Sequence, residues 1–274
     1  MKIAAAQLTC APADVPANAA RAAALAGRAR AAGAALVVFP ELTLTGYALD
    51  SVATDPALWL TGADDPRLDP LRSAGIATAV NAALRTDGPR PVIATLVHGA
   101  DGAHVTTYAK QHLRGQEREV FAAGDRPGRF ALGGLRFSLG ICYDNHVARV
   151  PGAGAAAGCA VHLASSLYGT DEGVAQRVAV HPGIARDHGM YVVLANHVGP
   201  AGPWTGCGGA AVWAPDGRVL AEADGHTPSL AVADVPLPAA AGAPWAVPFE
   251  RDGLPRPPSS GAGPTGSAGR RTGR

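Results

Sequence analysis

Short apolar runs alternate with longer amphipathic stretches through most of the chain. The amphipathic, alanine-rich stretches predict helices at residues 18–32, 71–84 and 174–188, with a further helical stretch after residue 142. The apolar runs predict strands at residues 2–8, 35–39, 91–98, 104–109, 135–141, 159–163, 191–196 and 229–235. Residues 210–213 and 218–221 flank Pro215-Asp216-Gly217, which is typical of a hairpin turn. Strands separated by helices indicate an α/β architecture.

The C-terminal part of the chain has a different composition. Residues 253–274 contain six glycines and four prolines, so this segment has too little apolar surface to offset the entropy lost on ordering. We therefore expect one domain over residues 1–238. An extension over residues 239–274 follows, and we expect it to be largely flexible from about residue 253.

Composition narrows the class of protein. Hydrophobic residues make up 47% of the 274 positions and charged residues 16%, which is typical of a globular chain. The formal net charge is only +1, which gives no electrostatic reason to expect a nucleic-acid or membrane partner. No stretch approaches the roughly 20 apolar residues that a membrane-spanning helix needs. Gln7 interrupts the first apolar run, so we also expect no secretory signal.

The four cysteines suggest a reduced environment. Cys10, Cys142, Cys159 and Cys207 form no C-x-x-C pair, and no His/Cys cluster has the spacing of a zinc site. A chain of this length does not need disulfides to fold. We therefore expect a cytoplasmic protein without a metal site.

Cys142 directly follows the predicted strand at residues 135–141. A turn from strand to helix would project its sulfur into a cleft at the carboxyl end of the sheet. Backbone N–H groups and a neighbouring cation would lower the thiol pKa from about 8.5 and favour the thiolate. The alternative interpretation is a small buried cysteine without a chemical role.

Glu41 and Lys110 also follow predicted strands. Glu41 comes after the apolar run ALVVFP, where burial would raise the carboxyl pKa and make it a general base. Lys110 ends the strand at residues 104–109, where its ammonium could stabilise an oxyanion. Lys2 and Lys110 are the only lysines in an arginine-rich chain, which suggests that the compact charge of Lys110 is needed. The alternatives are a solvated carboxylate and a surface lysine.

Three motifs together resemble those of the nitrilase superfamily of carbon–nitrogen hydrolases. They are Phe39-Pro40-Glu41 with Thr45-Gly46-Tyr47, Tyr108-Ala109-Lys110-Gln111-His112-Leu113, and Gly140-Ile141-Cys142-Tyr143-Asp144. They follow one another in the family's order and at similar separations. The resemblance extends over about residues 1–236, nearly everything except the C-terminal extension.

The resemblance implies a four-layer α-β-β-α sandwich without metal or organic cofactor. It implies that Cys142 attacks the substrate, that Glu41 takes the thiol proton, and that Lys110 stabilises the oxyanion with help from the Tyr143 backbone N–H. It also implies a second glutamate that orients Lys110 or the substrate. Glu117 is our choice for it, because its distance to Phe121 suits the motif, and Glu119 is the alternative. Homodimers or larger homo-oligomers are common in the family.

The chain departs from the family pattern after the cysteine. Many members continue with an aromatic residue, a proline and a glutamate, whereas residues 145–149 read NHVAR here. These positions help shape the wall of the site, so the departure concerns the substrate and not the catalytic residues. Residues 162–168 (HLASSLY) could line the pocket or form a simple polar loop. Asn196 and His197 are expected to follow a strand and face the same cleft, and His112 is interpreted as structural. The predicted substrate contacts are Tyr47, His146, Ser165, Ser166 and Asn196.

These residues favour a hydrolase that cleaves a small linear amide or N-carbamoyl compound through a thioester. The alternatives are a nitrilase that converts a nitrile to the acid, and acyl transfer to an amine instead of water. A non-catalytic binding protein that retains the fold is another possibility. A thiol redox protein would need a second nearby cysteine, for which Cys159 is the only candidate close in sequence. The expected partner is a small amide, carbamoyl compound or nitrile.

Overall fold

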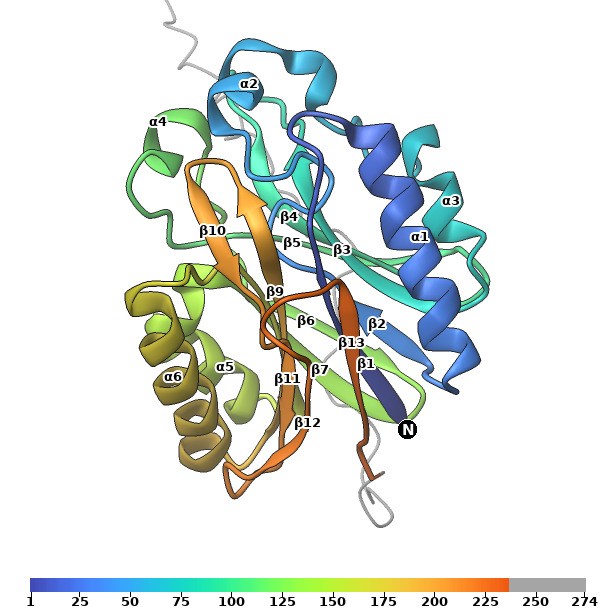
Figure 1. The fold of residues 1–274 in the computed structure, drawn as a ribbon, viewed down its shortest axis with the longest axis vertical. Coiled ribbons are helices and arrows are strands. Elements are labelled where there is room, and N and C mark those ends of the chain that lie inside the picture. Colours follow the sequence, from blue (N-terminus) through green and yellow to red (C-terminus); the bar gives the residue numbers. More distant parts are fainter. Residues whose placement is uncertain (237–274) are drawn as a thin grey trace, which may run out of the picture.

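The computed structural model describes residues 1–236, in which two six-stranded sheets form the centre of the fold (Figure 1). The first sheet has the order β5-β4-β3-β2-β1-β13. Strands β1, β2 and β3 are parallel, whereas β4, β5 and β13 pair antiparallel to their neighbours. Its strands are β1 (Lys2–Leu8), β2 (Leu36–Val38), β3 (Ala77–Leu84), β4 (Val92–His98), β5 (His104–Ala109) and β13 (Ser229–Asp234).

The second sheet has the order β6-β7-β8-β9-β11-β12, with β7, β8 and β9 parallel. Its strands are β6 (Gly128–Leu132), β7 (Leu135–Ile141), β8 (Val161–Ser166), β9 (Tyr191–Ala201), β11 (Ala211–Trp213) and β12 (Val219–Glu222). Strand β10 (Trp204–Cys207) pairs with the far end of β9. The two sheets meet where Gln7 and Leu8 of β1 pair with Asn196 and His197 of β9.

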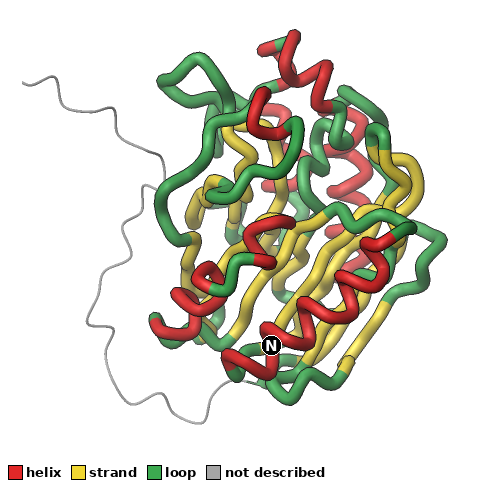
Figure 2. The backbone as a smooth tube through the Cα atoms, turned by 90° about the vertical axis from the view of Figure 1, so that its left-hand side faces the viewer, coloured by secondary structure: helices red, strands yellow, loops and turns green. Residues whose placement is uncertain are grey.

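Helices cover the outer face of each sheet. The first sheet carries α1 (Val15–Ala31) and α3 (Asp69–Arg72), and the second carries α5 (Arg149–Ala156) and α6 (Glu172–His188). Figure 1 shows these two pairs on opposite sides of the strands, and Figure 2 views the molecule from the side of α5 and α6. The short helices α2 (Leu49–Thr54) and α4 (Glu117–Val120) lie in loops. No helix within residues 1–236 combines the length and the apolar character that crossing a bilayer requires.

Three apolar clusters separate four layers. Along β1, Ile3 and Ala5 face the second sheet, whereas Ala4 and Ala6 pack beneath α1, because successive side chains of a strand point to opposite faces. A third cluster joins α6 to the outer face of the second sheet. The architecture is therefore the predicted α-β-β-α sandwich. The predicted domain boundary at residue 238 and the extension over 239–274 lie outside the described residues.

The helix predicted over residues 71–84 is wrong. Only Asp69–Arg72 is helical there, and Ala77–Leu84 is strand β3, which is buried along its whole length between β2 and β4. Alanine has little volume and fits either element, so pairing with two neighbouring strands overrides its helix propensity. Helix α1 also begins earlier than predicted, because Asp14 caps it through a hydrogen bond to the N–H of Ala17. Strands β6 and β10 were not predicted from the sequence.

Candidate active site

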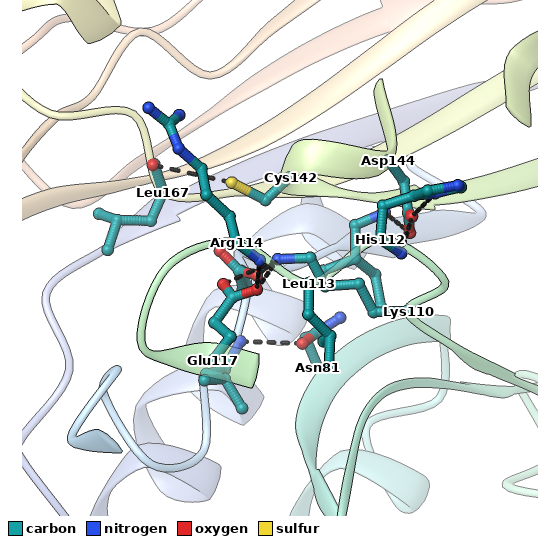
Figure 3. A network of polar contacts seen from close by, with 12 residues as sticks. Asn81, Lys110, His112, Leu113, Arg114, Glu117, Cys142, Asp144 and Leu167 are labelled. Carbon is teal, nitrogen blue, oxygen red and sulfur yellow. Dashed lines mark hydrogen bonds and ion pairs between the residues drawn. The ribbon is translucent and has the colours of Figure 1, made fainter. Parts of the chain in front are cut away.

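The three residues singled out in the sequence lie at the carboxyl ends of β2, β5 and β7. The ammonium of Lys110 donates a 2.7 Å hydrogen bond to Oε1 of Glu41, and both side chains are fully buried. The thiol of Cys142 lies close enough to Glu41 for each group to shift the pKa of the other. Figure 3 shows Lys110 between Glu117 and Cys142. The fold therefore brings a thiol, a carboxylate and an ammonium together from distant parts of the chain.

Glu117 is the second carboxylate of this group. Both of its oxygens accept hydrogen bonds from the Lys110 ammonium, at 2.8 and 2.7 Å. Its Oε1 also accepts from the Tyr47 hydroxyl at 2.9 Å, and its Oε2 accepts from the Arg114 backbone N–H at 2.9 Å. Glu119 lies on the solvent-exposed side of α4. Between the two glutamates predicted for this position, the structure places Glu117 against Lys110.

The loop that carries Glu41 has an unusual backbone. Leu42 and Tyr47 have positive φ angles of 46° and 61°, a conformation that side-chain-bearing residues rarely adopt. Asn81 of β3 holds this loop by accepting a 2.9 Å hydrogen bond from the Leu42 N–H. His197 of β9 contacts the Glu41 carbonyl oxygen through Nε2 at 2.5 Å. Strain of this kind persists only when surrounding contacts maintain it, and it is concentrated at functional sites.

Cys142 occupies the predicted turn between strand and helix. Strand β7 ends at Ile141, and Cys142 begins a short 3₁₀ helix, Cys142–His146, with a positive φ angle of 47°. Its side chain is partly exposed, and its sulfur lies 3.9 Å from the Leu167 carbonyl oxygen. The first N–H groups of a helix have no partner within the helix, and Tyr143 occupies the second position of this one.

The pKa of the Cys142 thiol differs from the value that the sequence analysis predicts. Burial and the Glu41 carboxylate raise the pKa of the Cys142 thiol above its ordinary value, despite the opposing charge of Lys110. The prediction of a lowered thiol pKa is therefore wrong, because loss of solvation outweighs the charge of Lys110. Burial also raises the pKa of Glu41 to about 7, against the attraction of Lys110. In the resting site the sulfur keeps its proton, and Glu41 has the pKa of a base that works near neutrality.

Burial alone would lower the pKa of Lys110, but the charges of the Glu41 and Glu117 carboxylates raise it. The ammonium therefore stays protonated. Two carboxylates around one cation leave an excess negative charge at the base of the site when both are ionised. Oε2 of Glu41 has no hydrogen-bond partner among residues 1–236, so this buried oxygen is available to accept a proton.

Asp144 connects the lysine loop to the cysteine turn. Its Oδ2 accepts hydrogen bonds from the Tyr108 hydroxyl at 2.7 Å and from the Ile141 N–H at 3.1 Å. Its Oδ1 accepts from the backbone N–H of His112 and contacts the ring Nδ1 of His112, at 2.9 and 2.8 Å. His112, which the sequence analysis interprets as structural, thus ties the segment after Lys110 to the residue two positions after Cys142.

A second buried chain of hydrogen bonds supports the turn from the α5 side. Nδ2 of Asn145 donates to the Cys142 carbonyl oxygen at 3.0 Å, and Oδ1 of Asn145 contacts Nε2 of His162 at 2.8 Å. The other ring nitrogen of His162 contacts the Ser138 hydroxyl at 2.8 Å. Burial lowers the pKa of His162 to about 3, so the ring is neutral. A Cβ at Gly140 would lie 2.5 Å from Oδ1 of Asn145, so this chain also requires a glycine in β7.

The predicted substrate contacts occupy different environments. Tyr47 binds Glu117, and His146 lies between the rings of Tyr143 and Tyr168, with its Nε2 3.1 Å from the Tyr168 hydroxyl. Ser165 and Ser166 are buried in β8, and the Ser166 hydroxyl has no hydrogen-bond partner among residues 1–236.

Asn196 is held by the protein itself. Its side chain accepts from the Tyr168 N–H and donates to the Gly208 carbonyl oxygen, each at 2.8 Å. Asn196 and His197 were expected to follow a strand, but both lie within β9, because they pair with β1 and pairing with β10 then extends the strand to Ala201. His197 nevertheless reaches the backbone of Glu41. Contact of these residues with a substrate stays a prediction.

Sequence reasoning did not single out Asn145 or Arg114 as site residues. Asn145 was noted only as part of a departure from a family pattern, and nothing local in the sequence reveals its partner His162. Arg114 had a weak signal, as a cation four residues after Lys110 with no acidic residue next to it. Within residues 1–236, no group of three or more histidine, cysteine or acidic side chains has the geometry of a metal site.

Comparison with known proteins agrees with this fold and site. Residues 2–244 match the carbon–nitrogen hydrolase family. The chain is 31% identical over 238 residues to Hydrolase Rv0480c of Mycobacterium tuberculosis, covering 77% of this chain and 80% of that protein. It is also similar to solved structures of an amidase from Nesterenkonia sp. AN1.

One of these structures shows acrylamide added to the active-site cysteine of the amidase. It has a TM-score of 0.78 and 29% identity over 86% of this chain and 93% of that chain. Another holds butyramide, with the same TM-score and identity over 86% of this chain and 91% of that chain. The fold is that of a nitrilase-type enzyme, and the buried ion pair between Glu41 and Lys110 fits the Glu–Lys–Cys triad of such enzymes. The protein belongs to the carbon–nitrogen hydrolase family.

Proposed function

We propose that the protein hydrolyses small linear carboxamides through a thioester on Cys142, with release of ammonia. The observation that carries this proposal is the buried group around Lys110. The ammonium binds one oxygen of Glu41 and both oxygens of Glu117, while Oε2 of Glu41 has no hydrogen-bond partner among the described residues. A free base oxygen beside a protonated thiol suits nucleophilic catalysis.

In the acylation step the Cys142 sulfur attacks the amide carbon as the thiol proton passes to Oε2 of Glu41. The new S–C bond converts the carbonyl into a tetrahedral oxyanion, which the Lys110 ammonium and the Tyr143 N–H stabilise. Protonated Glu41 then donates its proton to the amide nitrogen. The C–N bond breaks, ammonia leaves, and the acyl group stays on sulfur.

The second step reverses these roles. Water gives a proton to Glu41 and attacks the thioester carbon, forming a second oxyanion at the same position. The C–S bond breaks, the carboxylic acid leaves, and the proton on Glu41 returns to the sulfur. Glu117 reacts with nothing in this scheme, and it positions Lys110 through two hydrogen bonds.

An amide is favoured over a nitrile or an N-carbamoyl compound because the Nesterenkonia amidase structures hold acrylamide and butyramide. The same three residues would serve a nitrile, so the shape of the pocket decides between these substrates. A non-catalytic binding protein would need no free base oxygen beside its thiol. A homodimer and a cytoplasmic location are further proposals that rest on family resemblance and cysteine usage.

Ammonia release from butyramide, butyronitrile and N-carbamoylglycine tests the proposal. We expect butyramide to be the best of the three substrates. Cys142→Ala should abolish turnover, whereas Cys159→Ala, which removes a buried thiol from another cluster, should retain it. Intact-mass measurement should detect an acylated wild-type enzyme but no adduct on the Cys142→Ala variant. Full turnover by Cys142→Ala would rule out the assigned nucleophile.

A further inference from the structure

Arg114 places an exposed positive charge beside Tyr143, the residue that follows Cys142. Its backbone N–H is fixed by the 2.9 Å hydrogen bond to Glu117, and its side chain is exposed. In the view of Figure 3, this side chain runs from beside the Glu117 carboxylate toward the side of the picture on which Cys142 and Leu167 are drawn. The guanidinium lies 5.7 Å from the centre of the Tyr143 ring, and Tyr143 is the neighbour of Cys142.

No acidic residue within residues 1–236 forms an ion pair with Arg114. Two of the side chains that its charge influences, His146 and Tyr168, are neutral. Burial and the Arg114 charge lower the pKa of His146, whose ring is therefore uncharged near neutrality. Burial holds the pKa of the Tyr168 hydroxyl well above its ordinary value, although the Arg114 charge opposes this. Within residues 1–236 the guanidinium contacts the Tyr143 ring and has no hydrogen-bond partner, so its donors can bind a ligand.

The distribution of charge around the site would orient a charged substrate. Its base has an excess negative charge, because Glu41 and Glu117 surround a single ammonium. Beside Tyr143 lies the exposed cation of Arg114, which has no ion-pair partner among residues 1–236. An anionic group on a substrate would be repelled from the two carboxylates and attracted to Arg114. A substrate with an amide at one end and a carboxylate at the other would therefore enter amide first.

We propose that Arg114 is a specificity residue that binds the carboxylate of a linear monoamide of a short dicarboxylic acid. This inference rests on the proposed amidase function and deepens it by naming the substrate class. The planar guanidinium can donate two parallel hydrogen bonds to a carboxylate, which fixes orientation as well as charge. Tyr143 supports the guanidinium through its ring face.

Succinamate and butyramide provide the test, because they share an amide and chain length and differ in the terminal carboxylate. We expect the wild-type enzyme to have the higher kcat/KM with succinamate. Arg114→Met should lower kcat/KM for succinamate by about 10- to 100-fold, mainly through KM, as loss of a charged hydrogen-bond partner predicts. It should change kcat/KM for butyramide by less than about threefold. Arg114→Lys should restore part of the preference, since it keeps the charge without the bidentate geometry.

Arg118→Gln is the matched control. Arg118 lies in α4 of the same loop and is also exposed, but its Nε donates to the Leu113 carbonyl oxygen. This variant should keep the wild-type ratio of the two substrates. Equal losses on both substrates in Arg114→Met would overturn the inference, as would wild-type preference for butyramide. In either case turnover of butyramide would leave the proposed amidase function intact. Turnover of neither amide would overturn both proposals.

Discussion

The side-chain amide of Asn145 donates a 3.0 Å hydrogen bond to the backbone carbonyl oxygen of Cys142, three residues earlier. This bond closes the turn in which Cys142 has its positive φ angle of 47°. Because Oδ1 of Asn145 is also held by His162, the amide cannot rotate away. The strained backbone at the proposed nucleophile is thus supported by a residue that makes no contact with the other proposed catalytic groups.

Asn145→Ala should therefore weaken both stability and turnover. It leaves the Cys142 carbonyl oxygen and the His162 ring nitrogen without partners, which costs about 2–4 kcal/mol of unfolding free energy for two buried groups. We expect kcat to fall more than KM rises, because the thiol loses its orientation. Urea unfolding and steady-state kinetics measure the two effects. A variant that loses stability but keeps the wild-type kcat would show that the bond supports only the fold.

The pKa of Glu41 predicts the acid limb of the pH profile. This carboxyl must be ionised to take the thiol proton, and burial raises its pKa to about 7. Activity should therefore be lost as pH falls through about 7, with kcat/KM decreasing about tenfold per pH unit below it. An ordinary exposed glutamate would place this limb about 3 pH units lower. A flat profile between pH 5 and 7 would remove Glu41 from the role of base.

Glu117→Gln tests the positioning of Lys110. The substitution removes a charge from a fully buried ion pair and places an amide N–H group close to other donors. We expect a loss of about 3–5 kcal/mol in unfolding free energy and a large decrease in kcat. Glu119→Gln, two residues away on the exposed side of α4, should change stability by less than about 0.5 kcal/mol. Similar behaviour of the two variants would contradict the assignment of Glu117 as the second glutamate.

Asp144→Asn should separate the two loops that this carboxylate joins. Asp144 accepts four hydrogen bonds, two of them from backbone N–H groups, and an amide can accept at only one of its two positions. We expect thermal unfolding at a clearly lower temperature and a lower kcat. Asp87→Asn, at an exposed loop position, is the control and should leave both unchanged. An Asp144→Asn variant with wild-type stability would mean that the network adds little to the fold.

Much of this protein could be predicted from local sequence. Apolar runs that end at Pro40, Lys110 and Cys142 indicated buried strands with chemical groups at their ends, and the structure has strands β2, β5 and β7 there. Residues 77–84 were predicted to be helical, because alanine gives no periodic signal that distinguishes a buried strand from a helix.

Contacts between segments that are distant in the chain were decided only by the tertiary structure. The sequence was enough to place Glu41, Lys110 and Cys142 at the ends of strands, because the point at which an apolar run stops depends only on consecutive residues. It did not reveal that the Cys142 thiol pKa is raised, because desolvation depends on the packing of both sheets around it. Nor did it reveal the bond from Asn145 to Cys142, or the position of the Arg114 charge beside Tyr143. Solvation, hydrogen-bond partners and charge balance are properties of three-dimensional neighbours, and the fold alone determines which residues become neighbours.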